Sequence, residues 1–442
     1  MNVSFLQVMI CLLLGIAVII LLTAKFRVHA FFALMIGCFV TGLGVGMNAD
    51  EVITVIKDGF GSIMKSLGFI IVLGTTLGVL LEHTNCTQVM ANFILRKVGE
   101  RNAPLALSIT GFIVGLPVFC DSGYIVLSGL NRSLIKRTGI SAVVMSVSLA
   151  TGLYAVHCLI PPHPGAAAAA GTIGVDFGKL ISYGIIIAIP AMIVGHIWAK
   201  YAGNKIKYST AEEDEIEEDK TVHPSAVKAF LPVIVPIVLI ALSSFFHELS
   251  STNNIVKNLL VLGDPVVALS IGILLALTAK KSWDKQTLGK LLQESAEKAG
   301  GILVIIGAGG AFGAVLAATK IGDHFSSVFT LNSIGLLFPF LLTFILKTAQ
   351  GSSTVAIITA ASIVQPLLPA LGLNSEEGKL IAVLSMGAGS MMISHANDAY
   401  FWVITKFSSI EMNAMLKVYS TATIFMGLVS LLMIYLLSLI IL

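Results

Sequence analysis

Charged side chains are scarce in this sequence: Asp, Glu, Lys and Arg together make up 12% of its 442 residues. That is about half the share found in an average soluble domain. Hydrophobic residues make up 56%, so most of the chain must lie in an apolar solvent rather than in water. Several apolar runs reach or approach the roughly 20 residues that a membrane-spanning helix needs, which identifies that solvent as lipid. Such runs include 5–24, 28–46, 177–199, 224–246 and 418–442.

Motifs of enzymes and of metal or disulfide frameworks are missing. The five cysteines form no CxxC pair and mostly lie in apolar stretches, which argues against a zinc site or a disulfide scaffold. The sequence also has no HExxH, Walker A or GxSxG motif. We therefore expect no cofactor, no metal and no nucleic-acid partner. Nothing indicates ATP hydrolysis, so any energy that the protein uses would come from an ion gradient or from the gradient of a substrate.

The first apolar run is interpreted as a span rather than as a removable signal. Positive charge follows this run, at Lys25 and Arg27, instead of preceding it, and no small-residue cleavage site is present. The whole chain is then a multi-pass protein, which we expect in the cytoplasmic (inner) membrane of a bacterium.

The only long polar segment lies halfway along the chain. It carries seven acidic residues within 212–219 and has little apolar content, as is typical of a solvated linker. We predict a cytoplasmic linker at 201–224 between two halves, 1–200 and 225–442.

The two halves resemble each other. The segment 74–84 aligns without gaps on 309–319, and a polar interruption at Asp121 in the first half has a counterpart at Gln350 in the second. Such internal repeats are typical of secondary transporters. The identical pairs are Gly74/Gly309, Gly78/Gly313, Leu81/Leu316 and Thr84/Thr319.

Each half can be divided into five spans and one hairpin. The hairpin arms are mostly too short to cross the bilayer, so both hairpins are predicted to be re-entrant. They lie at 103–118 with 124–130 and at 336–346 with 355–364. The predicted spans lie near 5–24, 28–47, 66–83, 140–171 and 176–199, and near 226–247, 264–279, 298–318, 377–396 and 415–441.

An odd number of spans per half makes the repeats inverted. With the N-terminus outside, most of the 27 Lys and Arg residues fall on the cytoplasmic side, in agreement with the positive-inside rule. The first hairpin is then expected to open to the cytoplasm and the second to the outside. The predicted fold class is an all-α polytopic membrane protein of two inverted repeats.

Interrupted helices mark the candidate site. Irregular backbone at membrane depth is tolerated only where it is buried in protein or lines a watery cavity. Four such places occur: the two hairpin tips, residues 157–165 and residues 394–400. The tips carry small polar residues whose following helix starts suit a carboxylate, although small residues also simply ease helix packing. The candidate substrate-binding residues at the tips are Ser122, Gly123, Gly351, Ser352, Ser353 and Thr354.

Asp121 is the candidate proton-coupling residue. A carboxylate flanked by apolar arms is costly unless it is neutral, paired or functional, and burial favours its protonated form. The alternative is a permanent ion pair, for which Lys347 at the second tip is the possible charge partner.

The two broken helices supply further candidates. Pro161, Pro162 and Pro164 remove backbone donors, and His163 among them could face a cavity. His157 could bind substrate, carry protons or only pack. Asn397 and Asp398 are the corresponding substrate-binding candidates of the second half.

Four segments together resemble the gluconate:proton symporter family: AVHCLIPPHPGAA (155–167), IIGAGGAF (305–312), GSSTVAIITA (351–360) and SHANDAYFW (394–402). The likeness covers nearly the whole chain. It implies the elevator-type inverted-repeat fold of the ion-transporter superfamily, a homodimer, and a small organic anion carried with a proton. Asp121 takes the position of a Glu associated with the gluconate and D-serine members, so the pocket is expected to be re-tuned.

The expected function is proton-coupled uptake of gluconate or a related sugar acid or small hydroxy acid. Glycerate and D-serine carriers of the same family are the alternatives. An intramembrane hydrolase or an anion channel is the alternative from another class, but the sequence offers no nucleophile motif for the first, and the paired hairpins favour a carrier over the second.

Overall fold

The computed structural model describes residues 5–206, 224–247, 260–319 and 335–442, and within these ranges all regular secondary structure is helical. Seven stretches of the described residues are long and apolar enough to cross a membrane. They are Leu6–Lys25, Ala49–His83, Ala142–Ile173, Phe177–Gly203, Ala226–Ser244, Lys285–Ala318 and Met412–Ile441.

The helices of the first half are α1 (Phe5–Ile20), α2 (Ala30–Gly44), α3 (Ala49–His83), α4 (Cys86–Val98), α5 (Ala103–Gly115), α6 (Cys120–Thr138), α7 (Ala142–Leu159), α8 (Pro164–Ile173) and α9 (Phe177–Gly203). Those of the second half are α10 (Ala226–His247), α12 (Pro265–Leu277), α13 (Lys285–Ala318), α15 (Leu337–Gln350), α16 (Ser353–Val364), α17 (Glu376–Met391), α18 (Ala399–Ser408), α19 (Met412–Met415) and α20 (Thr421–Ile441).

Several predicted spans differ in length from the helices observed. Helices α2, α12 and α17 have 15, 13 and 16 residues and are shorter than the spans expected there. Helices α3 and α13 are much longer, with 35 and 34 residues, because each begins at polar helix-start signals upstream of its apolar part. Asp50 and Glu51 lie in the first turn of α3, where negative charge complements the helix dipole. The Asp284 side chain caps α13 by accepting from the backbone N–H of Thr287 at 2.9 Å.

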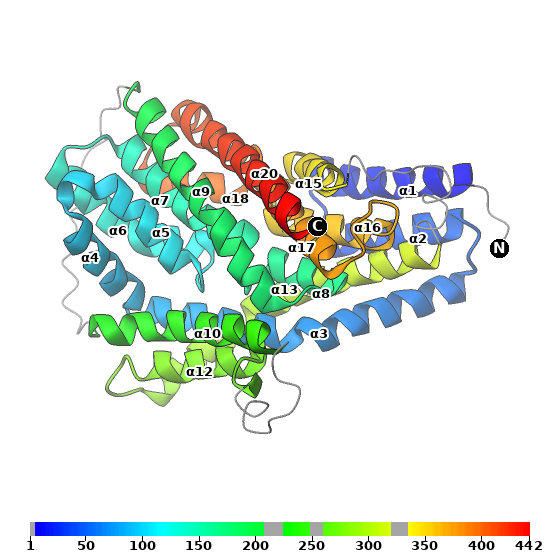
Figure 1. Cartoon of the computed structure of the whole chain (residues 1–442), viewed down its shortest axis with the longest axis horizontal. Helices are drawn as coiled ribbons and strands as arrows, with labels where there is room; N and C mark the ends of the chain where they lie inside the picture. Colours follow the sequence, from blue (N-terminus) through cyan, green and yellow to red (C-terminus); the bar gives the residue numbers. More distant parts are fainter. Residues whose placement is uncertain (1–4, 207–223, 248–259, 320–334) are drawn as a thin grey trace.

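Helices α3 and α13 lie side by side along the lower edge of the molecule (Figure 1). Glycines allow this close approach. A Cβ atom added to Gly59 would lie 2.7 Å from the carbonyl oxygen of Gly310, too close for any other residue without a shift of the backbone. Small residues at helix crossings are the usual means of tight packing between membrane helices.

Both predicted helix breaks are confirmed. The first separates α7 from α8 at residues 160–163, and the second separates α17 from α18 at residues 392–398. Pro161 and Pro162 lie in the first break, where they leave carbonyl groups without intrahelical donors. The broken helices therefore bring irregular backbone into the buried centre of the chain.

The hairpin tips are tighter than predicted. Helix α6 already begins at Cys120, so Asp121, Ser122 and Gly123 lie in its first turns rather than in a loop. In the second hairpin only Gly351 and Ser352 are non-helical. Gly351, at φ +82°, ends α15, and the Ser352 hydroxyl caps α16. A C-terminal glycine and an N-cap serine thus complete the turn.

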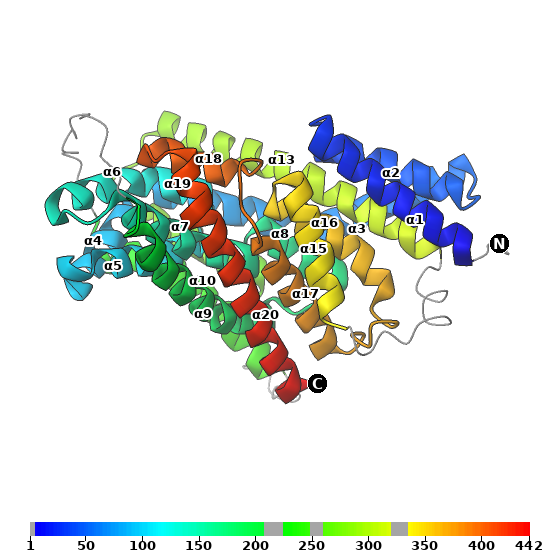
Figure 2. The same cartoon turned by 90° about the horizontal axis from the view of Figure 1, so that it is seen from above.

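The two halves are packed into each other. Helix α16 of the second half packs on α8 of the first, and α6 of the first half packs on α18 of the second (Figures 1 and 2). A Cβ added to Gly165 would lie 2.9 Å from Ile357, and the rings of Tyr124 and Tyr400 meet edge to face at 6.2 Å. Each hairpin thus rests against the broken helix of the opposite half.

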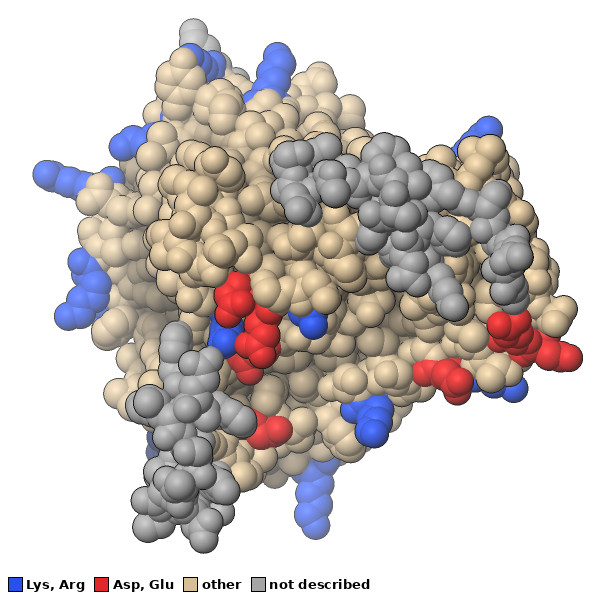
Figure 3. All heavy atoms as spheres, turned by 45° about the vertical axis from the view of Figure 1, so that its right-hand side comes forward, with Lys and Arg blue, Asp and Glu red and all other residues tan. Residues whose placement is uncertain are grey.

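The surface matches a membrane environment. In the face shown in Figure 3, Lys, Arg, Asp and Glu lie mainly at the edges and in one small central group, and a broad area between them carries no charge. Helix α9 presents large apolar side chains to the outside at helical spacing. These are Ile186, Ile189, Ile193 and Ile197, which are 40–58% exposed.

Candidate functional site

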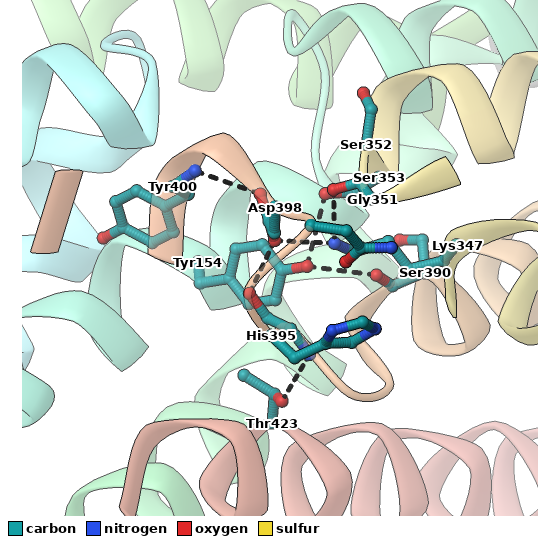
Figure 4. A network of polar contacts seen from close by, with 12 residues as sticks. Tyr154, Lys347, Gly351, Ser352, Ser353, Ser390, His395, Asp398, Tyr400 and Thr423 are labelled. Carbon is teal, nitrogen blue, oxygen red and sulfur yellow. Dashed lines mark hydrogen bonds and ion pairs between the residues drawn. The ribbon is translucent and has the colours of Figure 1, made fainter. Parts of the chain in front are cut away.

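A buried ion pair joins the second hairpin to the second helix break. The Nζ atom of Lys347, in the last turn of α15, lies 2.6 Å from Oδ2 of Asp398 and also donates to the Gly351 carbonyl at 2.7 Å (Figure 4). Lys347 is 0% and Asp398 5% exposed. Asp398 further accepts from the Ser394 hydroxyl at 2.5 Å and from the Tyr400 N–H at 3.0 Å. A pair this buried is stable only because its remaining donors and acceptors are satisfied.

The position of Lys347 corrects one expectation. The sequence suggests Lys347 as the charge partner of Asp121, but its ion pair is with Asp398. The reason is the helix geometry of the second hairpin: Lys347 lies four residues before Gly351 and reaches back over the end of its own helix to the break. Asp398, a predicted substrate-binding residue, is held by a cation instead of facing the substrate alone.

Asp121 lies beside this pair without being bonded to it. Its Oδ1 atom is buried and has no hydrogen-bond partner among the described residues. The carboxyl group is within electrostatic range of both Asp398 and Lys347. An unsatisfied carboxylate near a second carboxylate is stabilised by protonation. The arrangement therefore suits a group that gains and loses a proton.

The tip of the second hairpin faces the first broken helix. The Ser353 hydroxyl lies 3.3 Å from the Tyr154 hydroxyl, and Tyr154 also donates to the Ser390 carbonyl at 3.1 Å (Figure 4). Ser352 caps the backbone N–H of Val355. Gly351 sits so close to Asn397 that an added Cβ would lie 2.6 Å from its carbonyl carbon. The start of α16, with Thr354 in its first turn, is thus presented at the centre of the molecule.

The first break is bound to the first hairpin. The Nε2 atom of His163 lies 2.6 Å from the Gly115 carbonyl, at the end of α5, and its ring centroid is 4.8 Å from that of His157. The ring of His157 stacks on Tyr154 at 6.4 Å, and its Nδ1 atom is buried without a partner among the described residues. His163 therefore has a structural contact through Nε2, while its Nδ1 atom, like that of His157, is buried without a partner among the described residues.

Asn397 holds the second break in place. Its side-chain amide donates to the Thr348 carbonyl at 2.8 Å, and His395 approaches the same oxygen at 3.4 Å. Asn397 is exposed, unlike its neighbour Asp398. Its amide nitrogen thus satisfies a carbonyl at the end of α15, as expected for a helix C-terminus that needs donors.

Ser122 and Gly123 differ in their surroundings. The Ser122 hydroxyl contacts the carboxyl group of Glu82 on α3. Gly123 is buried, and an added Cβ would lie 2.8 Å from Leu153. Gly123 therefore allows hairpin and broken helix to pack closely.

Sequence reasoning missed several residues of this site. Tyr154 and Tyr400 stack at 5.7 Å, and the Tyr400 hydroxyl donates to the Ala150 carbonyl at 3.1 Å. Both polar atoms of the Gln350 side chain are buried without a partner among the described residues. Gln350 stands out in the sequence as a polar interruption, and that signal was sufficient to include it. Nothing distinguishes Tyr154 in the sequence from a packing aromatic.

The described residues contain no group of three or more His, Cys, Asp or Glu side chains that could hold a metal ion. What the site offers chemically is one buried cation, two carboxylates, hydroxyl groups and a helix start, all at interruptions of membrane helices.

Long apolar helices interrupted around buried polar groups define a polytopic membrane protein. The comparisons with known proteins show its class, a permease of the inner membrane and not an enzyme. The chain belongs to the GntP permease family, whose sequence profile matches residues 7–440. It is 32% identical to a gluconate permease of Pseudomonas aeruginosa, over 96% of this chain and 95% of the relative. It is 31% identical to the inner membrane permease YgbN of Escherichia coli K12, over 95% and 96%. It is 30% identical to the D-serine transporter DsdX of the same strain, over 97% and 98%.

Two solved structures share the fold. The chain superimposes on the YdaH transporter of Alcanivorax borkumensis with a TM-score of 0.61, over 89% of this chain and 90% of that one, at 13% identity. It superimposes on MtrF of Neisseria gonorrhoeae with a TM-score of 0.66, over 94% and 96%, also at 13% identity.

Proposed function

We propose that this permease takes up gluconate, or a related sugar acid or small hydroxy acid, together with a proton. One observation carries the proposal: the buried Lys347–Asp398 pair lies beside Asp121, a carboxyl group whose Oδ1 atom has no partner among the described residues. A cation that can receive a carboxylate and an acid that can hold a proton are the two groups that symport of an anion with a proton requires. Gluconate permeases among the relatives support the substrate class.

The start of α16 and Lys347 would bind the substrate carboxylate. Backbone N–H groups at a helix start attract anions, and Ser352, Ser353 and Thr354 add hydroxyl groups there. Gln350 has free amide atoms for the hydroxyls of a sugar acid. His157 offers its unpartnered nitrogen from the first break.

Protonation of Asp121 would prepare the site for the anion. Two carboxylates and an anionic substrate around one lysine leave an excess of negative charge in a medium of low dielectric constant. A proton on Asp121 removes one of these charges. Substrate and proton would then load together, and release of the proton on the cytoplasmic side would expel the substrate.

The order of helices supports an inverted repeat of 1–200 and 225–442. In each half a long helix (α3, α13) precedes a hairpin (α5–α6, α15–α16), a broken helix (α7–α8, α17–α18) and a long last helix (α9, α20). We propose that hairpins and broken helices move together as the transport unit of an elevator-type carrier in a homodimer. Single cysteines at Asn102, which is exposed directly before α5, and at Thr138 should both be labelled from the cytoplasmic side; labelling from opposite sides would contradict the inverted repeat.

The coupling role is tested with Asp121→Asn in liposomes that contain the purified protein. Because the side-chain amide of this variant cannot take up and release a proton, we expect concentrative uptake of labelled gluconate to be lost while exchange of internal for external gluconate continues. Unchanged accumulation against a gradient would contradict the role of Asp121. A counterflow series with gluconate, glycerate, ketogluconate, D-serine and citrate decides the substrate, and stronger counterflow of D-serine or glycerate would replace gluconate in the proposal.

A further inference from the structure

One face of α3 packs against the helix break and the hairpin tip of the first half. A Cβ added to Gly74 would lie 3.0 Å from the Pro162 side chain at the helix break. One added to Gly78 would lie 3.0 Å from the Pro117 carbonyl at the hairpin tip. Residues four apart lie on one face of a helix. The next position on this face is Glu82, so the two glycines bring α3 close enough for Glu82 to reach the start of α6.

Glu82 makes its contact with Ser122. The half-buried carboxyl group of Glu82 lies against the Ser122 hydroxyl, in the gap that the packing of Gly78 on the hairpin tip sets. Ser122 directly follows Asp121 in the first turn of α6. A carboxyl group and a hydroxyl group, which can each take and give a proton, therefore lie beside the turn of α6 that carries Asp121.

The other side of Glu82 faces a charged pair at the surface. Glu294 and Lys298 of α13 form an ion pair of 2.8 Å, with side chains 49% and 37% exposed, and both interact electrostatically with Glu82. Lys347 and Asp398 are the charged groups that face Asp121 from α15 and from the second break. Glu82 is therefore the intermediate position between Asp121 and the surface.

The second half has no such carboxyl group. In the ungapped alignment of 74–84 with 309–319, Glu82 corresponds to Ala317 and Gly78 to Gly313. Gly313 also packs on a hairpin helix, but against Ser362 near the end of α16, whereas Gly78 packs at the tip of the first hairpin. Neither the contact with a tip nor the acid is repeated in the second half. The acid lies in the half that holds Asp121.

We propose that Glu82 is a second proton carrier, through which Asp121 releases its proton toward the side of the Glu294–Lys298 pair. The proton leaves the Asp121 carboxyl group at the start of α6 and is taken up by the Glu82 carboxylate, which contacts Ser122, the residue that directly follows Asp121. Glu82 then gives its proton to water beside Glu294. This step rests on the proposed function, since it assumes that Asp121 carries the coupled proton.

The test uses purified full-length protein in liposomes containing a pH-sensitive dye, with labelled gluconate as the probe. Two rates are measured: accumulation driven by a proton gradient, with its acidification of the lumen, and counterflow at equal pH. For Glu82→Gln we expect accumulation and acidification to fall at least about tenfold while counterflow changes less than about threefold. Glu82→Asp keeps an ionisable group and should recover part of the accumulation. Ala317→Gln, at the repeat-related position, is the matched control and should behave as the wild type.

The outcomes separate the inference from the proposed function. Wild-type accumulation by Glu82→Gln would overturn the role of Glu82 and leave proton coupling intact. Equal losses of accumulation and counterflow in Glu82→Gln, with no recovery in Glu82→Asp, would make Glu82 a structural residue and also overturn the inference. Wild-type protein that exchanges gluconate without any response to a proton gradient would overturn the proposed coupling itself.

Discussion

The two halves use different chemistry for the same contact between broken helix and hairpin, which we call the joint. In both, the residue at the start of the second piece of the broken helix is bonded to the first helix of the hairpin. In the first half His163 contacts the Gly115 carbonyl at 2.6 Å, and in the second Asp398 contacts Lys347 at 2.6 Å. A carbonyl only accepts, so Nε2 of His163 must carry the proton of this bond.

This difference distinguishes a contact that only holds the structure from one that can change when an anion binds. The histidine–carbonyl bond joins groups that can both be neutral, so the charge of a ligand does not compete for it. The lysine–aspartate pair can be reorganised by any anion that offers Lys347 a second carboxylate. The first half thus holds a neutral contact, and the second half holds an ion pair that an anion could reorganise. Four substitutions test this contrast.

Lys347→Met is expected to have the largest effect. It leaves Asp398 buried without its cation, which costs about 3–5 kcal/mol. We expect little folded protein and no transport, measured by thermal unfolding in detergent and by counterflow. Combined with Asp398→Asn, the same substitution should recover thermal stability but not transport. A Lys347→Met protein as stable as the wild type would show that Lys347 and Asp398 do not form a charged pair.

Gly351→Ala should be the next most damaging change. The alanine must adopt φ +82° and its Cβ must displace the Asn397 backbone, for a combined cost of about 2–4 kcal/mol. The melting temperature in detergent measures this loss. Gly129→Ala, in a helix position with open space at the Cβ, is the control and should leave the melting temperature near that of the wild type.

His163→Gln tests the joint of the first half. Complete loss of the bond to a buried carbonyl would cost about 1–3 kcal/mol, which is an upper limit for this substitution and less than removal of the lysine. We expect a lower melting temperature with gluconate exchange still measurable, because the amide can donate to the same oxygen. Complete loss of exchange in a stable His163→Gln protein would place this histidine in the substrate path and remove the contrast between the joints.

Tyr154→Phe should have the smallest effect. The ring, with its stacking on His157 and Tyr400, remains, and only the hydroxyl contacts to Ser353 and Ser390 are lost. We expect about 0.5–1.5 kcal/mol of destabilisation, with a changed apparent affinity for gluconate measured by initial uptake rates. An affinity equal to that of the wild type would mean that Ser353 does not need Tyr154 for its position.

The interruptions of the fold could be predicted because their causes are local. Prolines at 161, 162 and 164 and the Gly-Ser pair at 351–352 end or start helices wherever they occur in an apolar run. The family profile and the relatives confirm the predicted permease class. Helix lengths were less predictable, since the polar starts of α3 and α13 lie outside apolar windows.

The partners across the site could not be predicted. Lys347 and Asp398 are 51 residues apart in the sequence. Asp121, the partner that the sequence suggested for Lys347, lies close by but belongs to a helix of the other half. Glu82 was overlooked because a lone acid near a helix end resembles a solvated residue. Only the packing of α3 on the hairpin, allowed by Gly78, shows that Glu82 lies near the start of α6.

The mutual packing of hairpins and broken helices has a consequence for how the protein is made. Helix α8 is covered by α16 and α18 by α6, so neither half completes its own core. When the ribosome has completed α9, the central surface of the first half is still uncovered, because the helices that cover it have not yet been translated. The two halves are one folding unit despite the linker between them. Split after Gly203 and expressed as two polypeptides, they should depend on each other for survival in the cell.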